Sequence, residues 1–183
     1  MFIQTEPTPN PNTLKFLPGC EVMTEGTADF AEASASSGSP LAAALFGIAG
    51  VTRVFYGADF ISVTKDNGAE WAVLKPQALA AIMDHFTSGA ALLSGDRPVA
   101  AEDDREDGPL VVQIKELLDT RVRPSVANDG GDIIFRGFRD GVVYLHMQGA
   151  CSGCPSSTAT LKHGIENLLR YYVPEVRAVQ AVE

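Results

Sequence analysis

Two cysteines stand three positions apart in the run Gly149-Ala150-Cys151-Ser152-Gly153-Cys154-Pro155. Cysteine thiolates are ligands of zinc and of iron-sulfur clusters, and such sites usually take four of them. One Cys-x-x-Cys pair supplies half of that number, and Cys20 is the only other cysteine in the chain. The cysteine pattern therefore predicts a metal or cluster site that two chains must share.

The residues around this pair are suited to holding thiolates. Alternating residues before Cys151 indicate a strand, and Pro155 is typical of the first turn of a helix. A sulfur at a helix N-terminus meets unpaired backbone N–H groups and the positive end of the helix dipole, which favour the thiolate. Glycines at 149 and 153 allow a sharp turn and close approach of a bound group, and hydroxyl donors are available from Ser156 and Ser157.

The spacing alone leaves other interpretations open. A single Cys-x-x-Cys pair also occurs as a redox dithiol or as half of a zinc site. Cys20 is most simply a core or loop thiol, and the run from Asp129 to Asp132 is typical of a turn rather than of a catalytic carboxylate pair. The three histidines have no metal-ligand spacing and are expected in surface or packing positions: His85, His146 and His163.

Composition and charge exclude several classes of protein. The chain has 183 residues, 45% hydrophobic and 20% charged, as in globular proteins rather than disordered or fibrous ones. Its formal net charge of −9 is poorly suited to nucleic acid, whose binding depends on Lys and Arg. No apolar run reaches the roughly 20 residues that span a bilayer. The first residues lack signal-peptide and transit-peptide features, so we expect a cytoplasmic protein, although a trimmed mitochondrial protein would look the same.

The charge divides the chain into three parts. Residues 1–88 hold nine acidic and four basic residues, 89–108 hold six and two, and 109–183 hold eight of each. The middle part mixes small residues, a proline and an acidic cluster, which is typical of a linker. We therefore predict a first domain at 1–88, a flexible acidic linker at 89–108 and a second domain at 109–183. The acidic first domain is suited to steering toward basic protein surfaces.

The fold class predicted for both domains is α+β. In the first, the pattern predicts strands at 13–17, 51–56 and 60–64, a loop over 21–39 and a helix over 40–46. A second helix is expected from about Pro76, with a buried face made of Leu79, Ile82, Met83 and Phe86.

The second domain is predicted to place a β-hairpin between helices. A helix capped by Asp107 starts at Pro109 and is ended or kinked at Pro124, and its buried face comprises Leu110, Ile114, Leu117 and Leu118. The hairpin pairs 133–138 with 142–148 around Asp140-Gly141, with Val143, Leu145 and Met147 on one face. The cysteine turn follows, then a helix from Pro155 with a core stripe of Leu161, Ile165, Leu168 and Tyr172, and a short last strand within 176–182.

Longer motifs match a known family. The runs Arg123-Pro124-x-Val126-x-x-Asp129-Gly130-Gly131-Asp132-Ile133, 149–158, Thr160-Leu161-Lys162-x-Gly164-Ile165-Glu166 and Val173-Pro174-Glu175-Val176 closely resemble the NifU C-terminal domain of Nfu-type iron-sulfur cluster carriers. The runs Thr8-Pro9-Asn10-Pro11-Asn12-Thr13-Leu14-Lys15-Phe16 and 74–86 resemble the N-terminal domain of Nfu proteins. Together the two resemblances cover nearly the whole chain.

The resemblance implies a 4Fe-4S cluster held between two chains, each giving Cys151 and Cys154, and delivered to apo-proteins. It implies a homodimer in the cluster-bound form, with apo iron-sulfur proteins and upstream assembly proteins as partners. The chain lacks the three-cysteine scaffold domain of the IscU type, so carriage is expected rather than primary assembly.

Four thiolates also accept a 2Fe-2S cluster or zinc, so the nuclearity rests on the resemblance. The alternatives are a thiol-disulfide oxidoreductase and a zinc-bridged dimer using the same pair. The sequence contains no nucleotide-binding glycine loop, Ser/His/Asp set or helical carboxylate pair. We therefore expect a carrier rather than an enzyme, and a protein that acts on neither nucleic acid nor membranes.

Overall fold

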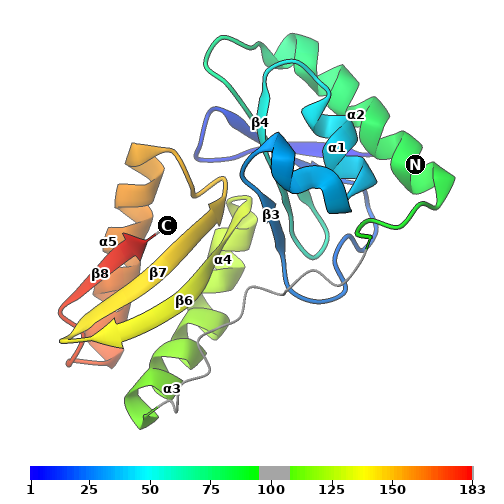
Figure 1. Cartoon of the computed structure of the whole chain (residues 1–183). Helices are drawn as coiled ribbons and strands as arrows, with labels where there is room; N and C mark the ends of the chain where they lie inside the picture. The colour runs from blue at the N-terminus through cyan, green and yellow to red at the C-terminus, as the bar shows by residue number, and fades with distance from the viewer. Residues whose placement is uncertain (95–107, 183) are drawn as a thin grey trace. The chain divides into compact units, whose positions relative to one another are not determined.

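The computed structural model describes residues 1–94 and 108–182 of the chain. They form two compact units, an N-terminal unit within 1–94 and a C-terminal unit within 108–182. Each unit combines one sheet with helices, which confirms the α+β class (Figure 1). Most of the predicted acidic linker lies outside the described residues. None of the described helices is long and apolar enough to cross a membrane.

The N-terminal unit is built on a five-stranded antiparallel sheet. The strands are β1 (Gln4–Pro7), β2 (Thr13–Leu17), β3 (Ala28–Phe30), β4 (Val51–Tyr56) and β5 (Ile61–Lys65), in the spatial order β1-β2-β5-β4-β3. The register pairs Phe16 with Ile61 and Val54 with Val63. Because side chains alternate between the faces of a sheet, these apolar residues can share one buried face. The strands expected at 13–17, 51–56 and 60–64 are confirmed to within one residue.

Three helical segments complete this unit: a 3-10 helix η1 (Ala33–Gly38), α1 (Pro40–Phe46) and α2 (Trp71–Ser88). The hydroxyl of Ser39 accepts a hydrogen bond of 3.2 Å from the Ala42 amide and so caps α1, whose first turn contains Pro40. After α2, Gly89 has a φ of 68°, a left-handed conformation that favours glycine at a helix end.

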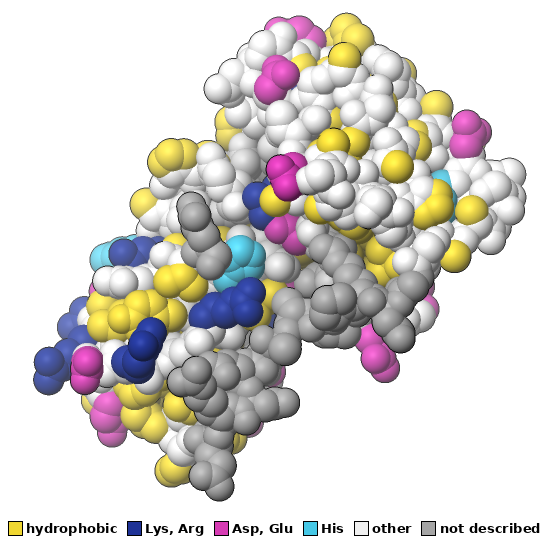
Figure 2. Space-filling view, viewed as in Figure 1, with side chains coloured by type: hydrophobic (Ala, Val, Ile, Leu, Met, Phe, Trp, Pro, Cys, Tyr) yellow, Lys and Arg dark blue, Asp and Glu magenta, His cyan; other side chains and the backbone are white. Residues whose placement is uncertain are grey.

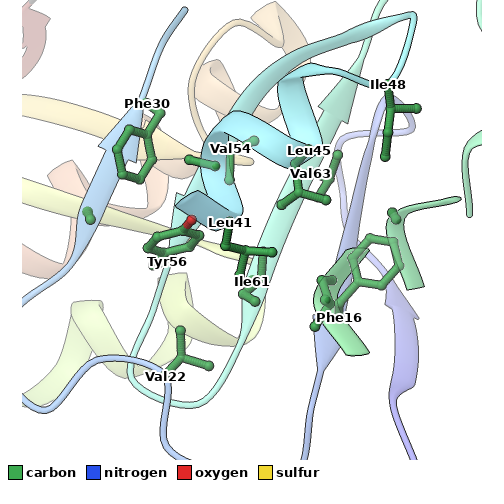
Figure 3. Close-up of a cluster of buried hydrophobic side chains, with 14 of the residues drawn as sticks. Phe16, Val22, Phe30, Leu41, Leu45, Ile48, Val54, Tyr56, Ile61 and Val63 are labelled. Atoms are coloured by element: carbon green, nitrogen blue, oxygen red, sulfur yellow. The ribbon is translucent and has the colours of Figure 1, made fainter. Parts of the chain in front are cut away.

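The core of the N-terminal unit lies between the sheet and its helices. Figure 3 shows Leu41 and Leu45 of α1 beside Val54 and Ile61 of the sheet. The hydroxyls of Ser39 and Tyr56 are hydrogen bonded at 2.8 Å within this core, so the buried tyrosine oxygen has a partner.

The structure corrects the sequence-based prediction at two places in this unit. The predicted loop at 21–39 contains β3 and η1, and a three-residue strand is too short for its alternation to be recognised. The helix α2 begins at Trp71 instead of Pro76, so Leu74 and His85 lie on its buried face. Met83, expected in the core, is exposed because the helix turns its other side to the sheet.

The C-terminal unit has a three-stranded sheet and a longer set of helices. Its elements are α3 (Pro109–Leu117), a π-helical turn η2 (Leu118–Val122), α4 (Arg123–Asn128), β6 (Gly131–Arg139), β7 (Val142–Gly149), α5 (Pro155–Tyr172) and β8 (Ala178–Val182). The order is β6-β7-β8, antiparallel between β6 and β7 and parallel between β7 and β8. A parallel neighbour needs a crossover, which α5 provides. The expected kink at Pro124 takes the form of the π-helical turn before α4.

The predicted hairpin is confirmed. Asp140 and Gly141 join β6 to β7 with φ values of 53° and 79°, and two positive φ angles match the twist of a tight hairpin. On β7, the side chains of Val143, Leu145 and Met147 are buried as expected.

The buried faces of the C-terminal helices differ in part from those predicted. On α5, Ile165 and Leu169 are buried, whereas Leu168 is half-buried and Tyr172 is exposed. The inward stripe of α5 therefore advances in steps of four. On α3 and η2, Ile114 and Leu118 are buried, while Leu110 and Leu117 are half-buried. Gly108 directly precedes α3, and the predicted cap Asp107 lies outside the described residues.

Candidate functional site

The cysteine pair lies in a short turn between β7 and α5. Gly149 and Gly153 have φ values of 64° and 79°, so glycine is needed for the chain to reverse twice within five residues. The amide of Ala150 donates to the Gly130 carbonyl (3.1 Å), and the amide of Ser152 donates to the Gly149 carbonyl (3.1 Å). These bonds fix the turn against the start of β6.

Cys154 is the residue that precedes the first turn of α5, as the sequence predicts. Its φ of −108° is extended, and its carbonyl accepts a hydrogen bond of 2.9 Å from the Thr158 amide. The sulfur is half-buried and lies 3.4 Å from the Ser156 hydroxyl. The side chain makes no capping hydrogen bond to the amides of α5, but its place at the helix N-terminus puts it near the positive end of the helix dipole.

Cys151 lies deeper than its neighbour. Only 5% of the residue is exposed, and it packs with the core of the C-terminal unit. A Cβ atom at Gly131 would lie 2.7 Å from the Cys151 sulfur and 2.5 Å from the Gln148 carbonyl oxygen, so the thiol occupies the space that a side chain at 131 would fill. The Thr158 hydroxyl donates to the Cys151 carbonyl (2.8 Å), which joins the turn to α5.

The surroundings of Cys151 favour the neutral thiol. Burial raises the pKa of Cys151 to about 12, and the carboxylates of Asp129 and Asp132 add to the effect. Desolvation penalises the charged thiolate, and a nearby negative charge repels it. Because a thiolate is the species that binds metal, loading this site must remove a tightly held proton from Cys151.

An ion pair between the half-buried Arg123 and the buried Asp132 lies next to the turn. The guanidinium of Arg123 donates two hydrogen bonds to the Asp132 carboxylate (3.1 and 3.0 Å) and one to Asp119 (3.0 Å). The Ile133 amide donates to the same Asp132 carboxylate (2.8 Å). The hydrogen bonds to Asp132 raise the pKa of Arg123, so the guanidinium stays charged. This network anchors α4 to the first residues of β6, against which Cys151 packs.

The remaining candidates are not part of the cysteine turn. Cys20 is exposed in a loop of the N-terminal unit. His85 is buried in α2, His146 bonds through Nδ1 to the Val182 carbonyl (3.1 Å), and His163 is exposed on α5. Within the described ranges, no group of three or more His, Cys, Asp or Glu side chains could hold a metal ion.

Comparison with known proteins gives matches along both units. A family model described as "Scaffold protein Nfu/NifU N terminal" matches residues 3–89, and one described as "NifU-like domain" matches residues 114–180. The human protein named "NFU1 iron-sulfur cluster scaffold homolog, mitochondrial" is 53% identical over 183 residues, which cover 100% of this chain and 72% of that protein. The chain belongs to the Nfu family.

A second curated protein and a solved structure are also similar to this chain. A protein of the same name from Drosophila ananassae is 54% identical over 184 residues, which cover 100% of this chain and 64% of that protein. The chain thus spans slightly less than two thirds of the Drosophila relative. A solution NMR structure described as a NifU-like protein from Saccharomyces cerevisiae covers 52% of this chain and 87% of its own at 25% identity, with a TM-score of 0.48.

Within this Nfu chain, the NifU-like match contains the cysteine turn and the ion pair next to it, and the N-terminal match contains Cys20. The sequence analysis gave Arg123, Asp132 and Thr158 no role at the cysteine turn and expected Asp132 to lie in a turn before the strand. The structure places Asp132 in β6. A signal was present, since one carboxylate before the apolar run Ile133-Ile134-Phe135 requires a cationic partner if the strand is buried.

Proposed function

We propose that this chain is an iron-sulfur cluster carrier. Two copies hold one 4Fe-4S cluster through Cys151 and Cys154 of each, and the cluster is then delivered to apo iron-sulfur proteins. The observation that carries the proposal is a pair of thiols in one turn at the surface end of α5, with no further ligand beside them among the described residues. The names of the relatives, which are cluster scaffold homologues, agree with it.

The number of sulfurs requires the second copy. A cluster with four thiolate ligands needs four cysteines, and the turn supplies two. Cys20 belongs to the other unit and is a single residue, so it cannot complete the set. The cluster-bound form is therefore a homodimer in this proposal, and the cluster lies between the two turns.

The different exposure of the two thiols suggests an order of binding. Cys154 is more exposed than Cys151 and directly precedes α5, so in this proposal it is the first ligand to engage the cluster. Cys151 must leave its position against Gly131 and give up its proton, which costs free energy because the thiol is favoured there. This free-energy cost weakens binding of the cluster, which favours its release to a recipient protein.

Transfer is an exchange of ligands without a change of oxidation state. A recipient thiol loses its proton and binds iron, while a carrier thiolate leaves the iron and regains a proton. Burial and the carboxylates of Asp129 and Asp132 favour this return to the neutral thiol at Cys151. Because each carrier pair gives up one cluster per transfer, the process is stoichiometric and the chain acts as a carrier rather than an enzyme.

In this proposal, upstream assembly proteins supply the cluster. The proposed domain boundaries are 1–88 and 109–183, with an acidic linker at 89–108 between them. The relatives are named as mitochondrial proteins. The cytoplasmic location expected from the sequence stays a prediction.

Anaerobic reconstitution with iron and sulfide tests the proposal. The wild-type chain is expected to form a brown species with four iron and four sulfide per two chains. Cys151→Ala and Cys154→Ala should each abolish this species, and the matched control Cys20→Ala should leave it unchanged. Full cluster occupancy in Cys151→Ala would show the ligand assignment to be wrong. A colourless dimer that binds one zinc would instead support a structural metal, and catalytic reduction of disulfides by the apo-protein would support thiol exchange.

A further inference from the structure

The outward face of α2 carries several exposed apolar side chains, with the polar Gln77 among them. Five residues of this face form what we term the α2 stripe: Ala72, Val73, Pro76, Ala80 and Met83. Val73 is 60% exposed and Met83 is 40% exposed. The opposite face of the same helix carries Leu74, Ala78 and Ile82, which are buried in the core. The helix α2 therefore has apolar residues on both sides, although Gln77 and Asp84 add polar groups to the exposed side.

A helix at a protein surface normally presents polar and charged residues to water, and one that is apolar all round is normally covered. Among the 18 residues of α2, only Lys75, Asp84 and His85 are ionisable, and His85 is buried. Pro76 lies in the helix interior, where a proline costs about 3 kcal/mol relative to alanine.

The surface around the α2 stripe is acidic. Asp66 and Glu70 precede the helix and are exposed, and Asp84 is exposed beside Met83. The described part of the N-terminal unit holds nine acidic and four basic residues. Two of the basic residues are engaged with carboxylates, Lys15 with Glu6 and Arg53 with Asp29. Figure 2 shows few Lys or Arg side chains over this unit and several over the C-terminal unit.

We propose that the α2 stripe is a docking site for an amphipathic helix of a partner protein, with an apolar face flanked by Lys and Arg. From Val73 to Met83 the stripe extends about 15 Å, or three helical turns, which matches apolar anchors at positions i, i+3 or i+4 and i+7 of a partner. The acidic residues at its ends and along one side select basic flanks through charge complementarity. The site lies in the unit without the cysteine pair, so this proposal is tested separately from the proposal of cluster binding.

Two synthetic peptides of 18 residues test this site on the full-length chain. Both carry leucine at i, i+3, i+4 and i+7, one with lysine flanks and one with glutamate flanks. Titration into the isotope-labelled chain is followed by amide chemical shifts. The lysine-flanked peptide is expected to shift the resonances of α2 and to bind at least tenfold more tightly than the glutamate-flanked one. Its affinity should fall as ionic strength rises.

Matched valine variants control for a general effect of apolar exposure. Val73→Lys should weaken binding of the lysine-flanked peptide at least tenfold. Val112→Lys changes another exposed valine, on α3 of the C-terminal unit, and should leave the affinity unchanged. Three results would overturn the proposal. They are equal binding of both peptides, chemical-shift changes confined to other elements, and no binding at about 100 µM peptide, a concentration that detects weak complexes. Self-association of the chain that Val73→Lys abolishes would also overturn it, because the occupant would then be a second copy.

Discussion

The N- and C-terminal units both contain a nearly buried arginine–aspartate pair, and the two pairs do different things. In the N-terminal unit, Arg53 on β4 bonds to Asp29 on the neighbouring strand β3 and so fastens two strands. In the C-terminal unit, Arg123 on α4 bonds to Asp132 at the start of β6. The Asp132 carboxylate also raises the pKa of Cys151. The same interaction joins two strands in one unit and lies beside the proposed cluster ligand Cys151 in the other.

The units also differ in how they use their cysteines. Cys20 is exposed in a loop of the N-terminal unit, whereas Cys151 is packed against the backbone of Gly131. An exposed cysteine is open to alkylation and oxidation, but a single thiol cannot supply a ligand pair. In the C-terminal unit, the buried Cys151 thiol lies near the carboxylates of Asp129 and Asp132, so the environments of Cys20 and Cys151 differ.

Thiol reactivity should show the largest difference between the units. At pH 8, Cys151 of the apo-protein is expected to react with iodoacetamide at least 100-fold more slowly than Cys20, because a pKa of about 12 leaves almost no thiolate. Below that pKa, each pH unit should raise the Cys151 rate about tenfold, so no plateau should appear up to pH 10. Mass spectrometry of the separate peptides measures both rates. Comparable rates at pH 8 would contradict the buried position of Cys151.

Variants of the two ion pairs test whether each pair affects only stability or also the reactivity of Cys151. Arg123→Met and Arg53→Met should each destabilise their own unit by about 3 kcal/mol, since each leaves a nearly buried carboxylate without its cation. Trp71 is the only tryptophan, so its fluorescence reports unfolding of the N-terminal unit. Amide exchange in β6 and β7 reports the C-terminal unit. Only Arg123→Met should also change the alkylation rate of Cys151, and a similar change in Arg53→Met would remove the proposed distinction.

Alanine substitutions at two glycines of the C-terminal unit distinguish an effect on packing from an effect on helix propensity. Gly131→Ala should cost about 2 kcal/mol and displace Cys151, because the new methyl group would meet the sulfur and a backbone oxygen. Gly164 lies on α5 with open space around it, so Gly164→Ala should stabilise the unit by up to about 1 kcal/mol. Chemical denaturation of both variants measures the difference. Equal stabilities would show that the turn relaxes to admit a side chain.

The sequence was most informative where local chemistry determines structure. The proline at α1, the Asp140-Gly141 hairpin and the glycines around the cysteine turn were all located because each imposes a backbone conformation. The cysteine pair itself was found from residue type and spacing. The start of α2 was misplaced since Pro76 is a signal for a helix beginning, yet here it lies within the helix.

The sequence was least informative about contacts between distant residues. The packing of Cys151 against Gly131 joins positions twenty residues apart, and nothing in either residue type indicates it. The burial of Cys151 follows from that contact, so the raised pKa of its thiol could not be predicted. The role of Asp132 depends on the partner Arg123, which lies on a different element. Such contacts require the fold, because they are set by how α4, β6 and the turn come together.

The smallest expected effect is a dependence of the N-terminal unit on acidic pH. Burial lowers the pKa of His85, so the folded state disfavours its protonation while the unfolded chain protonates near pH 6.5. The stability contributed by neutral His85 is therefore complete above pH 6.5 and falls below it, by at most about 1.4 kcal/mol per pH unit. Trp71 fluorescence during urea unfolding at pH 7 and pH 5.5 measures the change. His85→Leu should remove most of it, whereas the exposed control His163→Gln should not. A loss of the same size in all three proteins would assign the dependence to carboxylates, and the N-terminal unit would then resemble the C-terminal unit in relying on buried acids.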